Sequence, residues 1–133
     1  MADILDVAEW IMFGQGDYDC AVTISKTNNP YAPLKVSYDC QQSAEKILKA
    51  YLIAKDGERP QTHDVVLLLN RCKQHSADFN TLDVPCASLD TFKVASRYPS
   101  ELKLTQSDMA QALKDAGEIL VFTRSKLKEL GYE

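Results

Sequence analysis

Apolar residues recur every three or four positions along most of this chain, which is the spacing of one face of an α-helix. No segment shows a sustained alternation of apolar and polar residues, so β-strands are not expected. The pattern predicts an all-α fold, an up-and-down bundle of four to five antiparallel helices that forms a single domain over residues 1–133.

The first predicted helix begins near Asp3 and continues past Gly14 and Gly16, where we expect it to bend or loosen. The segment "NNPYAP" ends it, because prolines and asparagines disfavour helical geometry and favour turns. Its expected buried stripe consists of Ile4, Leu5, Ala8, Ile11 and Met12.

Three further helices are predicted in the middle of the chain. One covers 37–56 and ends at Gly57, and another follows Thr62 as its N-cap. A short helix around 86–96 is ended by Pro99. The residues of the helix after Thr62 that we expect in the core are Val65, Leu68, Leu69 and Cys72.

The last helix has the most regular pattern in the sequence. Thr105 and Asp108 form an approximate capping box at its start. Its apolar positions alternate in steps of four and three, which favours neighbouring helices at shallow crossing angles. These positions are Met109, Leu113, Ala116, Leu120, Thr123, Leu127 and Leu130.

Composition narrows the class of protein. A net charge of −4 over 133 residues argues against a broadly basic, nucleic-acid-coating surface, although a small basic cleft stays compatible with it. The acidic start "MADILDVAEW" does not resemble a signal peptide, and no apolar run reaches the roughly 20 residues of a membrane span. The four cysteines lack metal-site or redox spacing. We therefore expect a cytoplasmic protein without a membrane segment, metal or cofactor.

The stretch "SYDCQQSAEKILKAYLIAKDG" places Gln41, Gln42, Glu45, Lys46 and Lys49 close together on one helix. By spacing alone, Glu45 and Lys49 are an i,i+4 surface pair that contributes a few tenths of a kcal/mol. Amides beside a cation also suit phosphate oxygens or base edges. Both interpretations remain open, and spacing alone favours the solvated surface.

Two other segments carry candidate chemistry. His63, beside Asp64 at a helix start, is either a packed first-turn residue or a general base or phosphate contact. His75 is expected at the surface. Arg97 and Tyr98 follow the predicted short helix, and such a pair suits holding a phosphate and stacking on a base.

The order of these motifs resembles the HEPN family of small helical nucleotide-binding domains. The motifs that carry the resemblance are Trp10 with "DY" at 17–18, "QQSAEKILKAYL", "GERPQTHDV" and "SRYPSE". The resemblance implies a cleft for a nucleotide or RNA and a homodimer. It also implies a minimal nucleotidyltransferase partner, in some cases within a toxin–antitoxin system. The residues that it places at the cleft are Gln42, Lys46, Lys49, His63, Asp64, Arg97 and Tyr98.

Some members of that family are metal-independent ribonucleases with four to six residues between an arginine and a histidine. Here three residues separate Arg59 from His63, and three separate Arg71 from His75. A binding module is therefore the preferred hypothesis. The alternatives are a ribonuclease that uses His63 with Arg59 or Arg97, and a non-catalytic interaction bundle.

Overall fold

The computed structural model describes residues 4–92 and 104–132, and within them it contains five α-helices, one 3₁₀ helix and no strand. The all-α prediction is confirmed. In chain order the elements are α1 (Ile4–Ser25), α2 (Ala32–Asp56), α3 (Val65–His75), η1 (Ala77–Leu82), α4 (Asp83–Asp90) and α5 (Gln106–Glu129).

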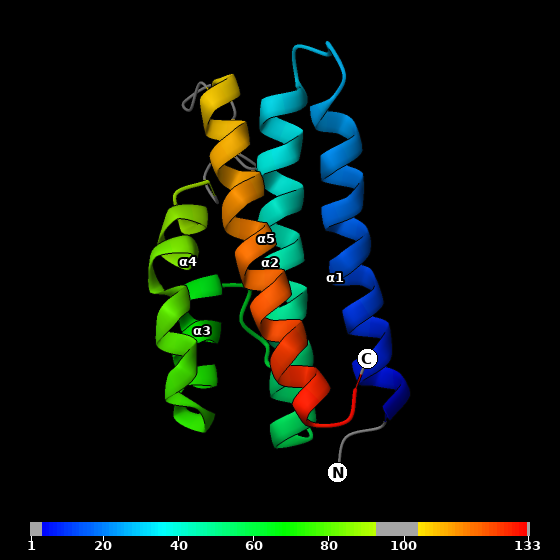
Figure 1. Cartoon of the computed structure of the whole chain (residues 1–133), viewed down its shortest axis with the longest axis vertical. Coiled ribbons are helices and arrows are strands. Elements are labelled where there is room, and N and C mark those ends of the chain that lie inside the picture. The colour runs from blue at the N-terminus through cyan, green and yellow to red at the C-terminus, as the bar shows by residue number, and fades with distance from the viewer. Residues whose placement is uncertain (1–3, 93–103, 133) are drawn as a thin grey trace.

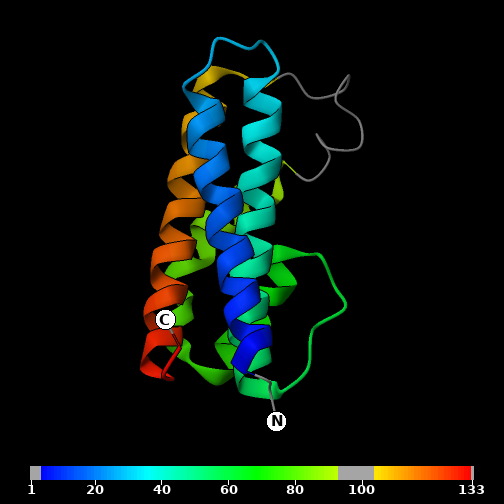
Figure 2. The same cartoon turned by 90° about the vertical axis from the view of Figure 1, so that its right-hand side faces the viewer.

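The three long helices stand side by side and form the body of the bundle (Figures 1 and 2). α1 runs antiparallel to α2, whereas α5 runs in the same direction as α2. The shorter elements α3, η1 and α4 pack on the other side of α5 and α2 from α1 (Figure 1). α2 is the central helix, because it contacts α1, α3, α4 and α5 and most of its residues are buried.

α1 is one continuous helix, and its buried face differs from the predicted stripe. Ile11 is buried as expected, but Ala8 and Met12 are exposed, and Val7 and Ala21 are buried instead. The glycines do not break the helix. A Cβ at Gly14 would lie 3.3 Å from the Ile47 backbone nitrogen, so this glycine lets α1 approach α2 closely.

α2 begins at Ala32, five residues earlier than the sequence pattern suggested, and ends where predicted. Gly57 adopts φ 78°, a left-handed conformation, and donates its N–H to the Ile53 carbonyl. The N-cap of α3 is Asp64, not Thr62 as predicted, because the Asp64 carboxylate accepts from the N–H groups of Val66 and Leu67. The four predicted core residues of α3 are all buried.

α5 begins at the predicted capping box between Thr105 and Asp108. Five of its seven seam positions are buried, including Thr123, while Leu113 is half-buried and Leu130 is exposed. Of the helix predicted over 86–96, residues 86–90 form the second part of α4, which begins earlier, at Asp83, directly after η1. Residues 91 and 92 form a turn, and 93–96 lie outside the described residues. In the described part of the chain, no helix is both long and apolar enough to cross a membrane.

Candidate functional site

The segment between α2 and α3 brings His63 back to the middle of α2. Glu45 lies eleven residues before the end of α2, which is roughly 16 Å along the helix axis. After Gly57, which adopts a left-handed conformation, the chain runs alongside α2 in the opposite direction before α3 begins (Figure 2). Six residues of nearly extended chain span about 20 Å, which is enough for this return. Residues 18 positions apart in the sequence thereby become neighbours.

Glu45 is the centre of a buried charged group. Its Oε2 atom accepts a hydrogen bond from Lys49 Nζ at 3.0 Å and lies 2.8 Å from His63 Nδ1. The Glu45 and Lys49 side chains are only 7% and 4% exposed, whereas the His63 side chain is 81% exposed. Glu45 and Lys49 therefore form a buried ion pair, and Glu45 also contacts the exposed imidazole of His63.

The ring of Trp10, on α1, packs against this charged group. The Lys49 ammonium lies 5.7 Å from the centroid of the Trp10 ring, and the Arg59 guanidinium lies 5.9 Å from it. Both distances are in the range of cation–π contacts. Arg59 is exposed, and the structure gives it no ion pair with another described residue. We name Trp10, Glu45, Lys49, Arg59 and His63 the α2 cluster.

Two other predicted site residues lie on the same face of α2. Lys46 is partly exposed and contacts Asp17 of α1 at 2.6 Å. Gln42 is half-buried one turn before Lys46. Because both lysines already contact a carboxylate, Arg59 is the exposed cation of the cluster that has the most freedom to meet a phosphate.

The structure leaves the remaining predicted residues apart from the cluster or undescribed. The Asp64 carboxylate caps α3 by accepting hydrogen bonds of 2.9 and 3.1 Å from backbone N–H groups, so this oxygen stabilises the start of the helix. Arg97 and Tyr98 lie outside the described residues. His75 Nε2 lies 2.8 Å from Asp56 Oδ1 of α2, at the far end of α3 from His63.

Sequence reasoning did not include Trp10 or Glu45 among the site residues. The i,i+4 spacing of Glu45 and Lys49 was visible, but spacing does not report burial. Trp10 comes close to Lys49 only because α1 packs on α2, and no local pattern encodes that contact. The early position of Trp10 in the family-like motif was the only signal for it in the sequence.

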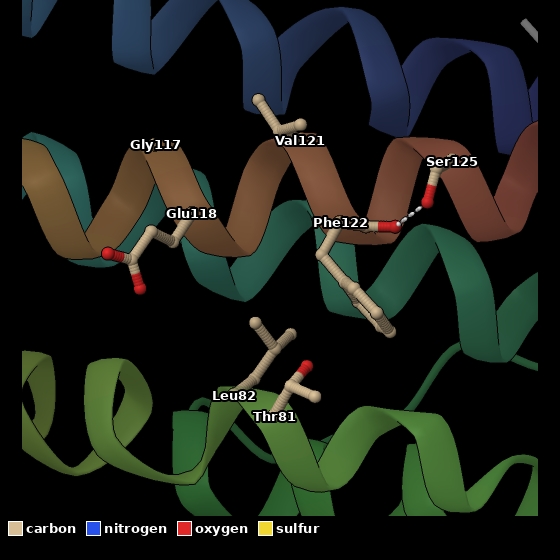
Figure 3. A pocket seen from close by; sticks show the side chains of 7 residues that line it. All are labelled: Thr81, Leu82, Gly117, Glu118, Val121, Phe122 and Ser125. Atoms are coloured by element: carbon tan, nitrogen blue, oxygen red, sulfur yellow. Dashed lines mark hydrogen bonds between the residues drawn. The ribbon is translucent and has the colours of Figure 1, made fainter.

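Apart from the α2 cluster, a groove lies on a different side of the bundle, between η1 and α5 (Figure 3). In this groove Leu82 and Phe122 point toward one another, and among the described residues that line it only Glu118 is ionisable. The ring of Phe122 packs edge-on against Phe79 with centroids 5.1 Å apart. The lining residues are Thr81, Leu82, Gly117, Glu118, Val121, Phe122 and Ser125.

The thiols do not add a reactive group to either site. Burial raises the pKa of Cys40 and of Cys86 to about 12 and raises the pKa of Cys72 as well, so these three remain protonated thiols at neutral pH. Cys20 is exposed on α1. Within the described ranges, no group of three or more His, Cys, Asp or Glu side chains is placed to hold a metal ion.

The protein is a small helical-bundle domain whose central helix carries a polar face beside an aromatic ring. The family model of the HEPN domain matches residues 33–126, which is most of the chain, and the protein belongs to the HEPN family. Membership supports, at the level of the family, a helical module related to nucleotides or RNA. Neither the curated proteins nor the solved structures contain a match to this sequence.

Proposed function

We propose that the protein is a binding module for a nucleotide or RNA and that the α2 cluster is its binding face. The observation that carries the proposal is the combination of an exposed guanidinium over Trp10 with an exposed imidazole held by a buried carboxylate. Guanidinium groups bind phosphates and stack on bases, and half-buried aromatic rings accompany such contacts. Family membership supports the same class of ligand.

In this proposal the residues have distinct roles. Arg59 contacts a phosphate, His63 contacts the sugar or base, and Gln42 supplies an amide from the next turn of α2. Lys49 holds Glu45, and Lys46 adds positive potential beside Asp17. The resemblance to the family also implies roles for Arg97 and Tyr98, which lie outside the described residues, as a second cation and an aromatic ring.

The single tryptophan of the chain allows a direct test. Trp10 emission would be recorded during titration with ATP, GTP, CTP, UTP and a short single-stranded RNA at low salt. We expect a saturable change with at least one of them, and about tenfold weaker binding for Arg59→Ala, the loss of one charge-assisted contact. Lys114→Ala on α5, with the same change in charge, should bind normally.

Absence of binding would contradict this function. If neither Trp10 emission nor calorimetry detects any of these ligands at sub-millimolar protein, the α2 cluster is not a nucleotide site. The remaining hypothesis would then be a non-catalytic bundle that positions a partner protein.

We also propose that the module acts as a cytoplasmic homodimer together with a minimal nucleotidyltransferase, in a system of the toxin–antitoxin type. The family motifs support this proposal, and light scattering of the purified chain tests the dimer. Co-purification with the product of an adjacent nucleotidyltransferase reading frame tests the partner.

One observation favours a second function, metal-independent RNA cleavage. A carboxylate bonded to Nδ1 of a histidine, as Glu45 is to His63, can orient the imidazole as a general base, and Arg59 could stabilise developing charge. Loss of a labelled RNA in the presence of EDTA would support it, provided that His63→Ala abolishes the loss. RNA that stays intact with the wild-type protein would exclude it.

A further inference from the structure

The chemistry around Glu45 determines which nitrogen of His63 carries its proton. Glu45 Oε2 accepts a hydrogen bond from the Lys49 ammonium in a buried pair, so the carboxylate is ionised and can only accept. The contact of 2.8 Å between Glu45 Oε2 and His63 Nδ1 therefore requires a proton on Nδ1.

In neutral His63 the other nitrogen, Nε2, then has no proton and carries a lone pair. The side chain is 81% exposed although Nδ1 is engaged, so Nε2 lies on the solvent side of the ring. The bond to one ring nitrogen sets the role of the other. Neutral His63 thus presents a hydrogen-bond acceptor to anything that binds at the α2 cluster.

An outward acceptor selects the kind of ligand group that it meets. Phosphate oxygens are themselves acceptors and do not pair with the Nε2 lone pair, whereas a sugar hydroxyl can donate to it. We propose that Glu45 is a positioning residue that keeps His63 in the Nδ1–H tautomer, so that Nε2 accepts a hydrogen bond from a ribose hydroxyl of the ligand. The hydroxyl contact rests on the proposed function, whereas the tautomer does not.

The chain contains its own control. In its second and last histidine, His75, Nε2 is instead the nitrogen that lies near a carboxylate, 2.8 Å from Asp56 Oδ1. The nearby carboxylate and the intrinsic preference of histidine both favour a proton on Nε2 of neutral His75. The two histidines are therefore expected to show opposite tautomers in one spectrum.

The first experiment measures the two tautomers. Long-range ¹H–¹⁵N NMR spectra of the wild-type protein would be recorded at about pH 8.5, where imidazole is mostly neutral. We expect a protonated Nδ1 and an unprotonated Nε2 for His63, and the reverse for His75; a His63→Ala sample assigns the signals. A protonated Nε2 on neutral His63 would overturn the proposal.

A double variant then tests the role of Glu45. Glu45→Met with Lys49→Met removes the acceptor and the paired ammonium together, which avoids a lone buried charge. The His63 signals should shift toward the Nε2–H tautomer, which is intrinsically favoured in histidine peptides, while His75 stays unchanged. A folded double variant in which His63 keeps Nδ1–H would overturn the positioning role.

The second experiment tests the hydroxyl contact by calorimetry at the same pH. ATP and 2′,3′-dideoxy-ATP differ only in the ribose hydroxyls, and we expect the dideoxy compound to bind about tenfold more weakly to the wild type. His63→Phe should bind both equally. Equal affinities in the wild type would overturn the hydroxyl contact even if the tautomers are as expected. If none of the nucleotides or the RNA binds, the proposed function fails instead.

Discussion

The α2 cluster and the groove between η1 and α5 bury side chains in different ways. In the cluster, Glu45 and Lys49 are both buried and bonded to each other. Near the groove each ion pair has an exposed carboxylate: Lys126, 12% exposed, pairs with Asp78, 69% exposed, and Lys73, 25% exposed, pairs with Asp83, 55% exposed. Leu82 and Phe122 line the groove, and the Phe122 ring packs on the buried Phe79.

This difference matters because a buried charge is costly unless it is paired, whereas an exposed pair contributes little. A structural core has no need for a buried ion pair, since apolar residues of similar volume are often as stable. The cluster holds such a pair next to an exposed imidazole, and the groove does not. The cluster is therefore the better candidate for a site, and stability measurements can test the contrast.

The largest expected effect comes from breaking the buried pair. Lys49→Met leaves the Glu45 carboxylate buried without its ammonium, and we expect the free energy of unfolding to fall by about 3–5 kcal/mol. Urea denaturation measures it. The double variant with Glu45→Met should recover most of the loss. A single variant within 1 kcal/mol of the wild type would mean, on the scale of exposed pairs, that the pair is not buried in solution.

The next largest effect is expected in the groove. Leu82 is 3% exposed, and Leu82→Ala should lower the free energy of unfolding by about 2–3 kcal/mol through lost apolar contact and a cavity. Val84 on α4 is 78% exposed, so Val84→Ala is a matched truncation that should change stability by less than about 0.5 kcal/mol. Similar losses in both variants would contradict the packing of η1 against α5.

The approach of α1 to α2, which brings Trp10 to Lys49, gives the third prediction. A Cβ at Gly14 would meet backbone atoms of Ile47 and Ser43 at 3.3 and 3.4 Å, so Gly14→Ala should destabilise the fold by about 1–2 kcal/mol. At Gly16 nothing lies within 4 Å, and Gly16→Ala should stabilise by about 0.5–1 kcal/mol. Thermal unfolding followed by circular dichroism measures both. If both substitutions changed the stability in the same direction, the close approach of α1 to α2 at Gly14 would be contradicted.

The smallest effect is expected at the neighbouring lysine. Asp17 and Lys46 are 29% and 27% exposed, and Asp17→Asn should cost about 0.5 kcal/mol in urea denaturation. The same experiment in 1 M salt should reduce this cost, because salt screens partly exposed charges. If Asp17→Asn lowered the free energy of unfolding as much as Lys49→Met, Lys46 could not be described as the more exposed and weaker of the two paired lysines.

The fold could be predicted to the level of its elements because helical signals are local. Gly57 ended α2, and Thr105 with Asp108 began α5, as the capping rules require. The buried face of α1 was predicted only in part, since several apolar residues lie all around that helix and the choice of face depends on its neighbours. Met12 is exposed for this reason, and Val7 is buried.

The candidate site could be predicted only in part. Lys49 and His63 were named from their motifs, but the spacing of Glu45 and Lys49 on one helix is the same for an exposed pair and a buried one. Their burial depends on α1 and on the returning segment after Gly57, which lie far away in the sequence. Spacing within one helix therefore could not distinguish a surface pair from the centre of a site.

The amino-acid sequence by itself determined that the chain is helical, where most helices end and which family it belongs to, because periodicity, caps and motifs are properties of neighbouring residues. Only the tertiary structure decided that Glu45 joins Lys49 to His63 beneath Trp10. Burial and long-range contact arise when separate helices pack together, and they determine whether a charged side chain is solvated or held in a site.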